Sequence, residues 1–283
     1  MIPRRIAFIN EKGGSAKTTL VANVGAWLAL ERGRRVLAID LDPQGQLARA
    51  LGVKADATRR SALELLVDEM LGDEASLDGP RAPRAGLPSR PTRIPGLDMV
   101  LADKRLGLAP LLDPAAARPG ADLTARLART LDTAPELADY DFVLLDAPPS
   151  FGPITLSALR AAHEVVIPVP LTYLALDGCA ELLRTMESVR QGYGNPDLRL
   201  TMVVPTFYRR TRLAHEILDR LKTRFPKEIA HTVLGYHVRI DEAPARGLAV
   251  FEHAPRDRGA RALAALAEEL ELRAPEPPPT CRA

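Results

Sequence analysis

The chain has 283 residues, of which 46% are hydrophobic and 26% are charged, and its formal net charge at pH 7 is +2. This composition is typical of a folded globular protein and excludes disorder over the whole length. The small net charge excludes a bulk positive field, so any binding to nucleic acid has to come from local clusters of basic residues.

The N-terminal part of the chain is predicted to form a strand, a glycine-containing loop and a helix. Residues 5–10 alternate into an apolar strand, and residues 18–31 place apolar side chains on one helical face before Gly33. Further apolar strands, with helical patterns between them, are predicted at residues 35–40, 97–101, 142–146, 165–169 and 200–204. Short strands that alternate with amphipathic helices are typical of βαβ units. We therefore expect an α/β fold with a single doubly wound, mostly parallel sheet and helices on both faces.

Two segments are expected to lie outside this packed core. Residues 78–95 are rich in Pro, Arg and Gly, which do not sustain a helix or a central strand, so an exposed loop is predicted. A last helix is predicted at residues 258–272, and residues 274–283 contain four prolines that indicate a solvated tail. No apolar run reaches the roughly 18 residues that span a bilayer, and the N-terminus has no signal-peptide pattern, so we expect a cytoplasmic protein.

A phosphate-binding loop is predicted between the first strand and the first helix. Residues 12–19 read Lys-Gly-Gly-Ser-Ala-Lys-Thr-Thr. At this place in the fold, backbone N–H groups and a helix N-terminus converge on an anion. Lys17 is predicted to reach the β- and γ-phosphates, and the Thr18 hydroxyl to bind Mg²⁺. The alternative, a glycine-rich turn with a solvated lysine, fits the neighbouring strand and helix less well. The predicted nucleotide-binding residues are Lys12, Gly13, Gly14, Ser15, Ala16, Lys17, Thr18 and Thr19.

Carboxylates follow two of the predicted strands. Asp40 and Asp42 come at the end of the second strand, and Asp146 ends the strand at residues 142–146. Open α/β sheets bind their ligands at the carboxyl ends of the strands. Acidic groups are costly to bury there unless they are paired or face a cation, so a Mg²⁺-nucleotide explains them better than two ordinary turns do.

Three motifs carry a family resemblance: the phosphate loop at residues 12–19, the segment Asp-Leu-Asp-Pro-Gln-Gly at residues 40–45, and the segment Asp-Ala-Pro-Pro-Ser at residues 146–150. Together they resemble the ParA/Soj branch of the deviant Walker ATPases, which also contains MinD. The similarity extends nearly end to end. It implies a P-loop NTPase fold, an ATPase domain at residues 1–273, and ATP with Mg²⁺ as cofactors.

The resemblance also implies a role for each motif residue. Lys12 corresponds to the lysine that reaches across an ATP-bound homodimer to the partner's phosphates, and Asp42 to the residue that positions or activates the attacking water. Together with Lys17 these are the candidate catalytic residues. The candidate Mg²⁺ ligands are Thr18, Asp40 and Asp146. Pro205 and Thr206 correspond to nucleotide contacts. Ala16 replaces a glycine of the family, and its Cβ restricts the backbone, so slow hydrolysis is predicted.

Basic residues cluster in the C-terminal third of the chain. The candidate DNA-binding residues are Arg209, Arg210 and Arg212 in this cluster, together with Arg239 and Arg246, which flank a segment that the ParA/Soj resemblance implies takes part in non-specific DNA binding. Contacts from such side chains to phosphates give salt-sensitive binding that is independent of base sequence. The alternative interpretation is a solvated, arginine-rich helix face.

Three functional hypotheses follow. The first is a nucleoid-associated ATPase that dimerises with ATP, binds DNA non-specifically, and is stimulated by a ParB-like or other partner to segregate DNA or position a cargo. The second is a MinD-like ATPase at a membrane surface, which the proline-rich tail disfavours because it lacks an amphipathic anchor. The third is an ATP-binding assembly module with little turnover, suggested by Ala16.

Overall fold

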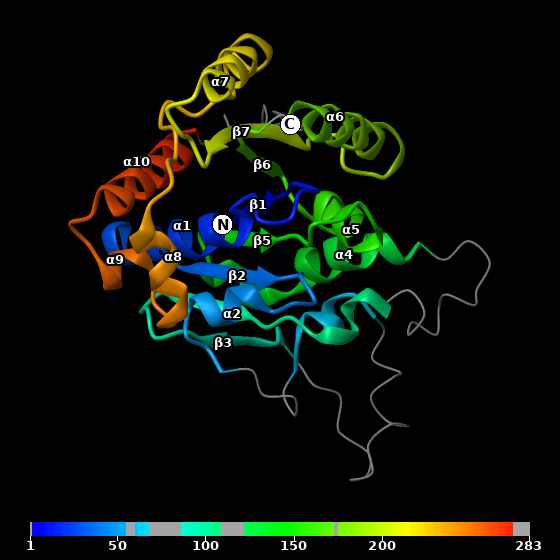
Figure 1. Ribbon diagram of the computed structural model, residues 1–283. Helices are drawn as coiled ribbons and strands as arrows, with labels where there is room; N and C mark the ends of the chain where they lie inside the picture. The colour runs from blue at the N-terminus through cyan, green and yellow to red at the C-terminus, as the bar shows by residue number, and fades with distance from the viewer. Residues whose placement is uncertain (1, 55–59, 68–85, 109–121, 173–174, 274–283) are drawn as a thin grey trace, which may run out of the picture.

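A computed structural model describes residues 2–54, 60–67, 86–108, 122–172 and 175–273 (Figure 1). The strands are β1 (Arg4–Phe8), β2 (Val36–Asp40), β3 (Ser89–Pro91), β4 (Leu97–Val100), β5 (Phe142–Asp146), β6 (Glu164–Pro170) and β7 (Arg199–Thr206). The α-helices are α1 (Lys17–Arg32), α2 (Gln46–Ala50), α4 (Arg126–Thr133), α5 (Pro153–Ala161), α6 (Ala175–Gly192), α7 (Arg212–Arg224), α8 (Val238–Ala245), α9 (Val250–His253) and α10 (Arg258–Leu272). None of the helices in the described ranges is both long and apolar enough to cross a membrane.

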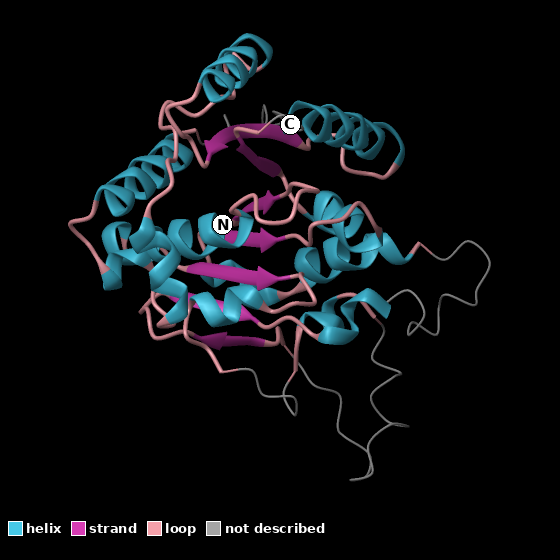
Figure 2. Ribbon diagram, viewed as in Figure 1, coloured by secondary structure: helices cyan, strands magenta, loops and turns pink. Residues whose placement is uncertain are grey.

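The described strands form one seven-stranded sheet with the order β3-β4-β2-β5-β1-β6-β7. Every neighbouring pair is parallel except β3 and β4. Helices cover both faces (Figure 2). Alternation along β1 and the residue after it shows how the two cores arise. Ile6 and Phe8 belong to a buried cluster with residues of α1, α2, α8, α9 and α10, whereas Ala7 and Ile9 belong to a cluster with residues of α4, α5, α6 and α7. The predicted fold class is confirmed.

The predicted loop at residues 78–95 is wrong for part of its length. Ser89–Pro91 forms strand β3 and pairs antiparallel with β4 at the edge of the sheet. Pro91 is compatible with this position because an edge strand leaves some backbone groups without a ladder partner. Residues 78–85, and the predicted tail at residues 274–283, lie outside the described residues. The predicted absence of a membrane anchor therefore stays a prediction.

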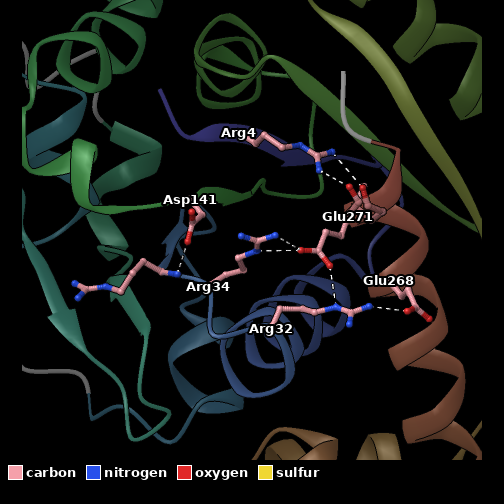
Figure 3. Close-up of polar contacts among 8 residues, drawn as sticks. Arg4, Arg32, Arg34, Asp141, Glu268 and Glu271 are labelled. Carbon is pink, nitrogen blue, oxygen red and sulfur yellow. Dashed lines mark hydrogen bonds and ion pairs between the residues drawn. The ribbon is translucent and has the colours of Figure 1, made fainter. Parts of the chain in front are cut away.

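The carboxyl end of α10 is clamped to the start of the sheet and to α1 (Figure 3). Arg32 contacts Glu268 at 2.6 Å and Glu271 at 3.0 Å, and Arg34 contacts Glu271 at 2.9 Å. Arg4 donates a 3.0 Å hydrogen bond to the backbone carbonyl of Glu271. Because α1 begins at the predicted phosphate loop, this clamp fixes α10 against the helix that supports the loop.

Candidate nucleotide-binding site

Asn10 ties the start of the loop between β1 and α1 to the sheet. The Asn10 amide nitrogen donates to the Pro168 carbonyl of β6 at 2.6 Å, and its side-chain oxygen accepts from the Lys12 backbone N–H at 2.8 Å. The Asn10 backbone carbonyl accepts from Lys17 Nζ at 3.0 Å. These three bonds curl the loop over the carboxyl end of β1. Asn10 was not predicted as a site residue, although its place between a strand and the glycine loop is a signal that could have identified it.

Two residues of the loop adopt left-handed backbone conformations. Gly14 has a φ of 67°, and Ala16, directly before α1, has a φ of 79°. A Cβ placed on Gly13 or Gly14 would meet no atom within 4 Å, so this side of the loop is open to a ligand. Ser15 is buried and its backbone carbonyl accepts a 3.3 Å hydrogen bond from the hydroxyl of Thr206 in β7. The glycines therefore face outwards while Ser15 anchors the loop.

Ala16 is under backbone strain, which we expect Ala16→Gly to relieve. The left-handed conformation costs a non-glycine residue about 1–2 kcal/mol, and the greater freedom of glycine in the unfolded chain offsets part of that gain. The variant should raise the free energy of unfolding in urea by about 0.5–1 kcal/mol. Ala265→Gly, at an exposed position of helix α10, is the control and should lower it by about 1 kcal/mol. Loss of stability in both variants would contradict the assignment of strain to Ala16.

Lys17 is the first residue of α1 and its side chain is buried beneath the loop. Burial lowers the pKa of its ammonium group, and the nearby carboxylates of Asp146 and Asp42 act in the opposite direction. Removing this cation from water is costly unless negative charge compensates it. A bound phosphate would supply that charge on the open side of the loop.

Asp40 and Asp146 lie side by side at the carboxyl ends of β2 and β5, where they are register partners. Both are buried. The oxygens of Asp40 accept backbone N–H groups from Asp42 at 3.1 Å and Leu47 at 3.2 Å, and burial, followed by the charge of Asp146, raises its pKa well above the ordinary value.

Asp146 is the carboxylate that is best placed to face a cation. Among the described residues its two buried oxygens accept no backbone N–H group, and the side chain that acts on them as a hydrogen-bond donor is that of Thr18. Burial raises its pKa to about 7, although Thr18 and Lys17 lower it. Among the described residues, no group of three or more His, Cys, Asp or Glu side chains forms a metal site of its own. The residues thus fit Mg²⁺ only in the presence of further oxygen ligands, such as the Thr18 hydroxyl and phosphate oxygens.

Comparison with known proteins identifies the family. A family model described as an AAA domain matches residues 3–200. The chromosome-partitioning ATPase Soj of Thermus thermophilus is 42% identical and is covered over 97% of its length by 96% of this chain. The sporulation initiation inhibitor protein Soj of Bacillus subtilis is 36% identical, with 94% of this chain and 97% of that protein covered. The chain belongs to the ParA/Soj family of ATPases.

A solved structure has a fold similar to that of this ParA/Soj chain. Cobyrinic acid a,c-diamide synthase from Mycobacterium smegmatis, with bound ADP and magnesium, is 33% identical with a TM-score of 0.73. The match covers 94% of this chain and 93% of that one. That protein is named for a different reaction, whereas the relatives of higher identity are Soj proteins. Its bound ADP and magnesium agree with the predicted cofactors.

The remaining predicted catalytic residues of the ParA/Soj chain lie at the rim of the loop. Lys12 is exposed, and its Nζ donates to the Thr172 hydroxyl at 2.7 Å. Asp42 is half-buried and accepts the backbone N–H of Gln44 at 3.0 Å. Thr18 and Thr19 are half-buried in the first turn of α1. The structure therefore places Lys12, Lys17 and Asp42 around one loop, and their catalytic roles stay predictions.

Pro205 and Thr206 end strand β7 beside the loop. The Pro205 carbonyl accepts from the Leu234 backbone N–H at 2.9 Å, and Thr206 is fully buried with its hydroxyl on Ser15. In this arrangement Thr206 supports the loop backbone. Direct contact of either residue with a nucleotide stays a prediction.

The predicted DNA-binding arginines are all exposed, but three of them are paired. Arg239 and Arg246 share Glu242, at 2.6 Å and 3.6 Å. Arg212 pairs with Glu216 at 2.8 Å. Arg209 stacks over the Tyr236 ring at 5.9 Å, and no ion pair involves Arg209 or Arg210 within the described ranges. Sequence reasoning missed the role of Glu242, whose spacing of three residues from Arg239 and four from Arg246 was the available signal.

Proposed function

We propose that this chain is an ATP-dependent dimerisation switch that binds DNA non-specifically and hydrolyses ATP slowly. Its cellular task is to segregate chromosome or plasmid DNA or to position a cargo. It acts in the cytoplasm, where it associates with the nucleoid. A ParB-like or other partner protein stimulates hydrolysis. The observation that carries the proposal is the presence of a buried Lys17 and a buried Asp146, whose oxygens accept no backbone N–H group among the described residues, beneath an open glycine loop.

The side chains divide the work between charge neutralisation and positioning. Lys17 binds the β- and γ-phosphates from below the loop, while backbone N–H groups at residues 13–16 hold them from the side. Thr18, Asp40 and Asp146 hold Mg²⁺, which when bound neutralises phosphate charge. Asp42 orients the attacking water. Because phosphoryl transfer depends mainly on positioning and electrostatic stabilisation, a site completed by Lys12 of a second copy couples hydrolysis to dimerisation.

DNA binding is proposed for the arginine surface formed by Arg209, Arg210, Arg212, Arg239 and Arg246. Arg209 and Arg210 lie in the loop before α7, and Arg239 and Arg246 lie on and directly after α8. A dimer presents two copies of this surface, so ATP-induced dimerisation strengthens binding to a long duplex without any new contact within one subunit.

The binding of arbitrary duplex DNA tests this function. With ATP and Mg²⁺, affinity should rise and should fall steeply with salt. Arg210→Ala should weaken binding about equally for all base sequences and reduce the slope of log affinity against log salt by about 1 per arginine contact. Arg239→Ala should have a smaller effect, because Glu242 already pairs with it. Arg184→Ala, at an exposed position of α6, is the control. Binding that does not respond to ATP, or an Arg210→Ala variant that binds like the control, would reject the proposal.

A further inference from the structure

The ammonium group of Lys12 is held by its own chain. Its Nζ donates a 2.7 Å hydrogen bond to the hydroxyl of Thr172, which lies two residues beyond the end of β6. Both side chains are exposed. The contact therefore lies at the surface, where a second molecule can reach it.

The backbone next to Lys12 is also held close to β6 and α6. Asn10 links the Lys12 N–H to the Pro168 carbonyl of β6 through bonds of 2.8 Å and 2.6 Å. Glu11 lies close to α6, because its Oε2 is 4.0 Å from the position that a Cβ on Gly178 would occupy. The start of the loop is thus pre-set towards β6 and α6, and the Thr172 contact extends this arrangement to the lysine side chain.

The proposed function requires Lys12 to contact the nucleotide of a second copy, and one ammonium group cannot occupy both places. We propose that Thr172 is a positioning residue that retains Lys12 on its own chain until a nucleotide-bound partner displaces the contact. This inference rests on the proposed function. Thr172 acts through Lys12 and takes no part in the chemistry.

The hydrogen bond from Lys12 to Thr172 is weaker than the phosphate contact that would replace it, which suits this role. A hydrogen bond from an exposed ammonium group to a neutral hydroxyl contributes little net free energy, because water competes for both groups. A charge-assisted contact between the ammonium group and phosphate is stronger. The Thr172 contact therefore biases the lysine without trapping it. A symmetric dimer breaks two such contacts, so their effects multiply in the dissociation constant.

The test compares Thr172→Val, which removes the hydroxyl at nearly constant shape, with Thr172→Ser, which keeps it. Sedimentation equilibrium with Mg²⁺ and a non-hydrolysable ATP analogue measures the dimer dissociation constant. We expect Thr172→Val to lower that constant by about threefold to tenfold, and Thr172→Ser to behave like the wild type. Thr172→Ala provides a second hydroxyl-free variant, and thermal melting checks the folding of each.

Variants in a Lys12→Met background separate the two proposals. If Thr172 acts through Lys12, Thr172→Val has no effect on the dimer constant in that background. Two results overturn the inference alone, provided that Lys12→Met weakens the dimer. One is a dimer dissociation constant that is unchanged or raised in Thr172→Val and Thr172→Ala. The other is a Thr172→Ser variant that behaves like these two variants. A Lys12→Met protein that dimerises like the wild type overturns the role of Lys12 in the proposed function and the inference with it.

Discussion

Lys17→Ala is expected to reduce kcat/KM for ATP hydrolysis by about a hundredfold or more. The Lys17 ammonium group is buried beneath the loop, donates to the Asn10 carbonyl at 3.0 Å, and lies close enough to Asp146 to lower the pKa of that carboxyl. Its removal takes away the ammonium group that acts on the Asp146 carboxyl and that is proposed to bind the phosphates. Phosphate-release assays and nucleotide titrations would show loss of turnover together with loss of nucleotide affinity.

Lys54→Ala is the matched control for this change. Lys54 is an exposed lysine close to the end of α2, so its removal takes away the same side chain without disturbing the loop. It should leave turnover within about a factor of two, since exposed surface substitutions have small effects. A Lys17→Ala protein that folds, binds ATP and turns it over like the Lys54→Ala control would contradict the proposed phosphate site.

Glu164→Ala is expected to lower the free energy of unfolding by about 3–5 kcal/mol. Glu164 begins β6 and its side chain is fully buried. Its two oxygens accept a bidentate pair of 2.9 Å hydrogen bonds from Arg4, and one of them also accepts from the Thr201 hydroxyl at 2.8 Å. Arg199 lies 3.2 Å away. The substitution leaves these partners without the charge that satisfies them, and Arg4 also holds the end of α10.

Urea unfolding of Glu164→Ala and of Glu187→Ala gives the comparison. Glu187 pairs with Arg190 at an exposed position of α6, so its loss should cost about 0.5 kcal/mol or less. Although burial raises the pKa of Glu164, the hydrogen bonds and charge of Arg4 hold it below the ordinary value of 4.5. The stability that Glu164 contributes is therefore fully present above pH 4.5 and declines as the pH falls below that value. Equal losses in the two variants at pH 7 would contradict a buried ionic cluster.

The sheet could be predicted because its central strands are continuous apolar runs. Phe142–Asp146 and Arg258–Leu272 have the predicted bounds, since buried strands and amphipathic helices leave strong patterns in the sequence. The phosphate loop at residues 12–19 and the carboxylates of Asp40, Asp42 and Asp146 could be placed because each comes at the end of one of these predicted strands. The edge strand Ser89–Pro91 could not, because a short strand with a proline has the composition of a loop.

Contacts between distant segments were also beyond prediction from the sequence. The bonds of Asn10 to Pro168 and of Lys12 to Thr172 each join residues about 160 positions apart, and depend on β1 and β6 being neighbours in the sheet. The DNA-binding role of Arg239 was predicted from its charge and from the family resemblance. Its pairing with Glu242 depends on the side-chain directions of α8.

An ATP-dependent change in mass is the most direct test of the proposed switch. Light scattering with Mg²⁺ and a non-hydrolysable ATP analogue should give a mass twice that of the 30.7 kDa chain, whereas Mg²⁺ with ADP should give that of one chain. Lys17→Ala should stay at the lower mass with both nucleotides. The same mass for the wild type with the ATP analogue and with ADP would contradict a dimerisation switch controlled by the loop at residues 12–19.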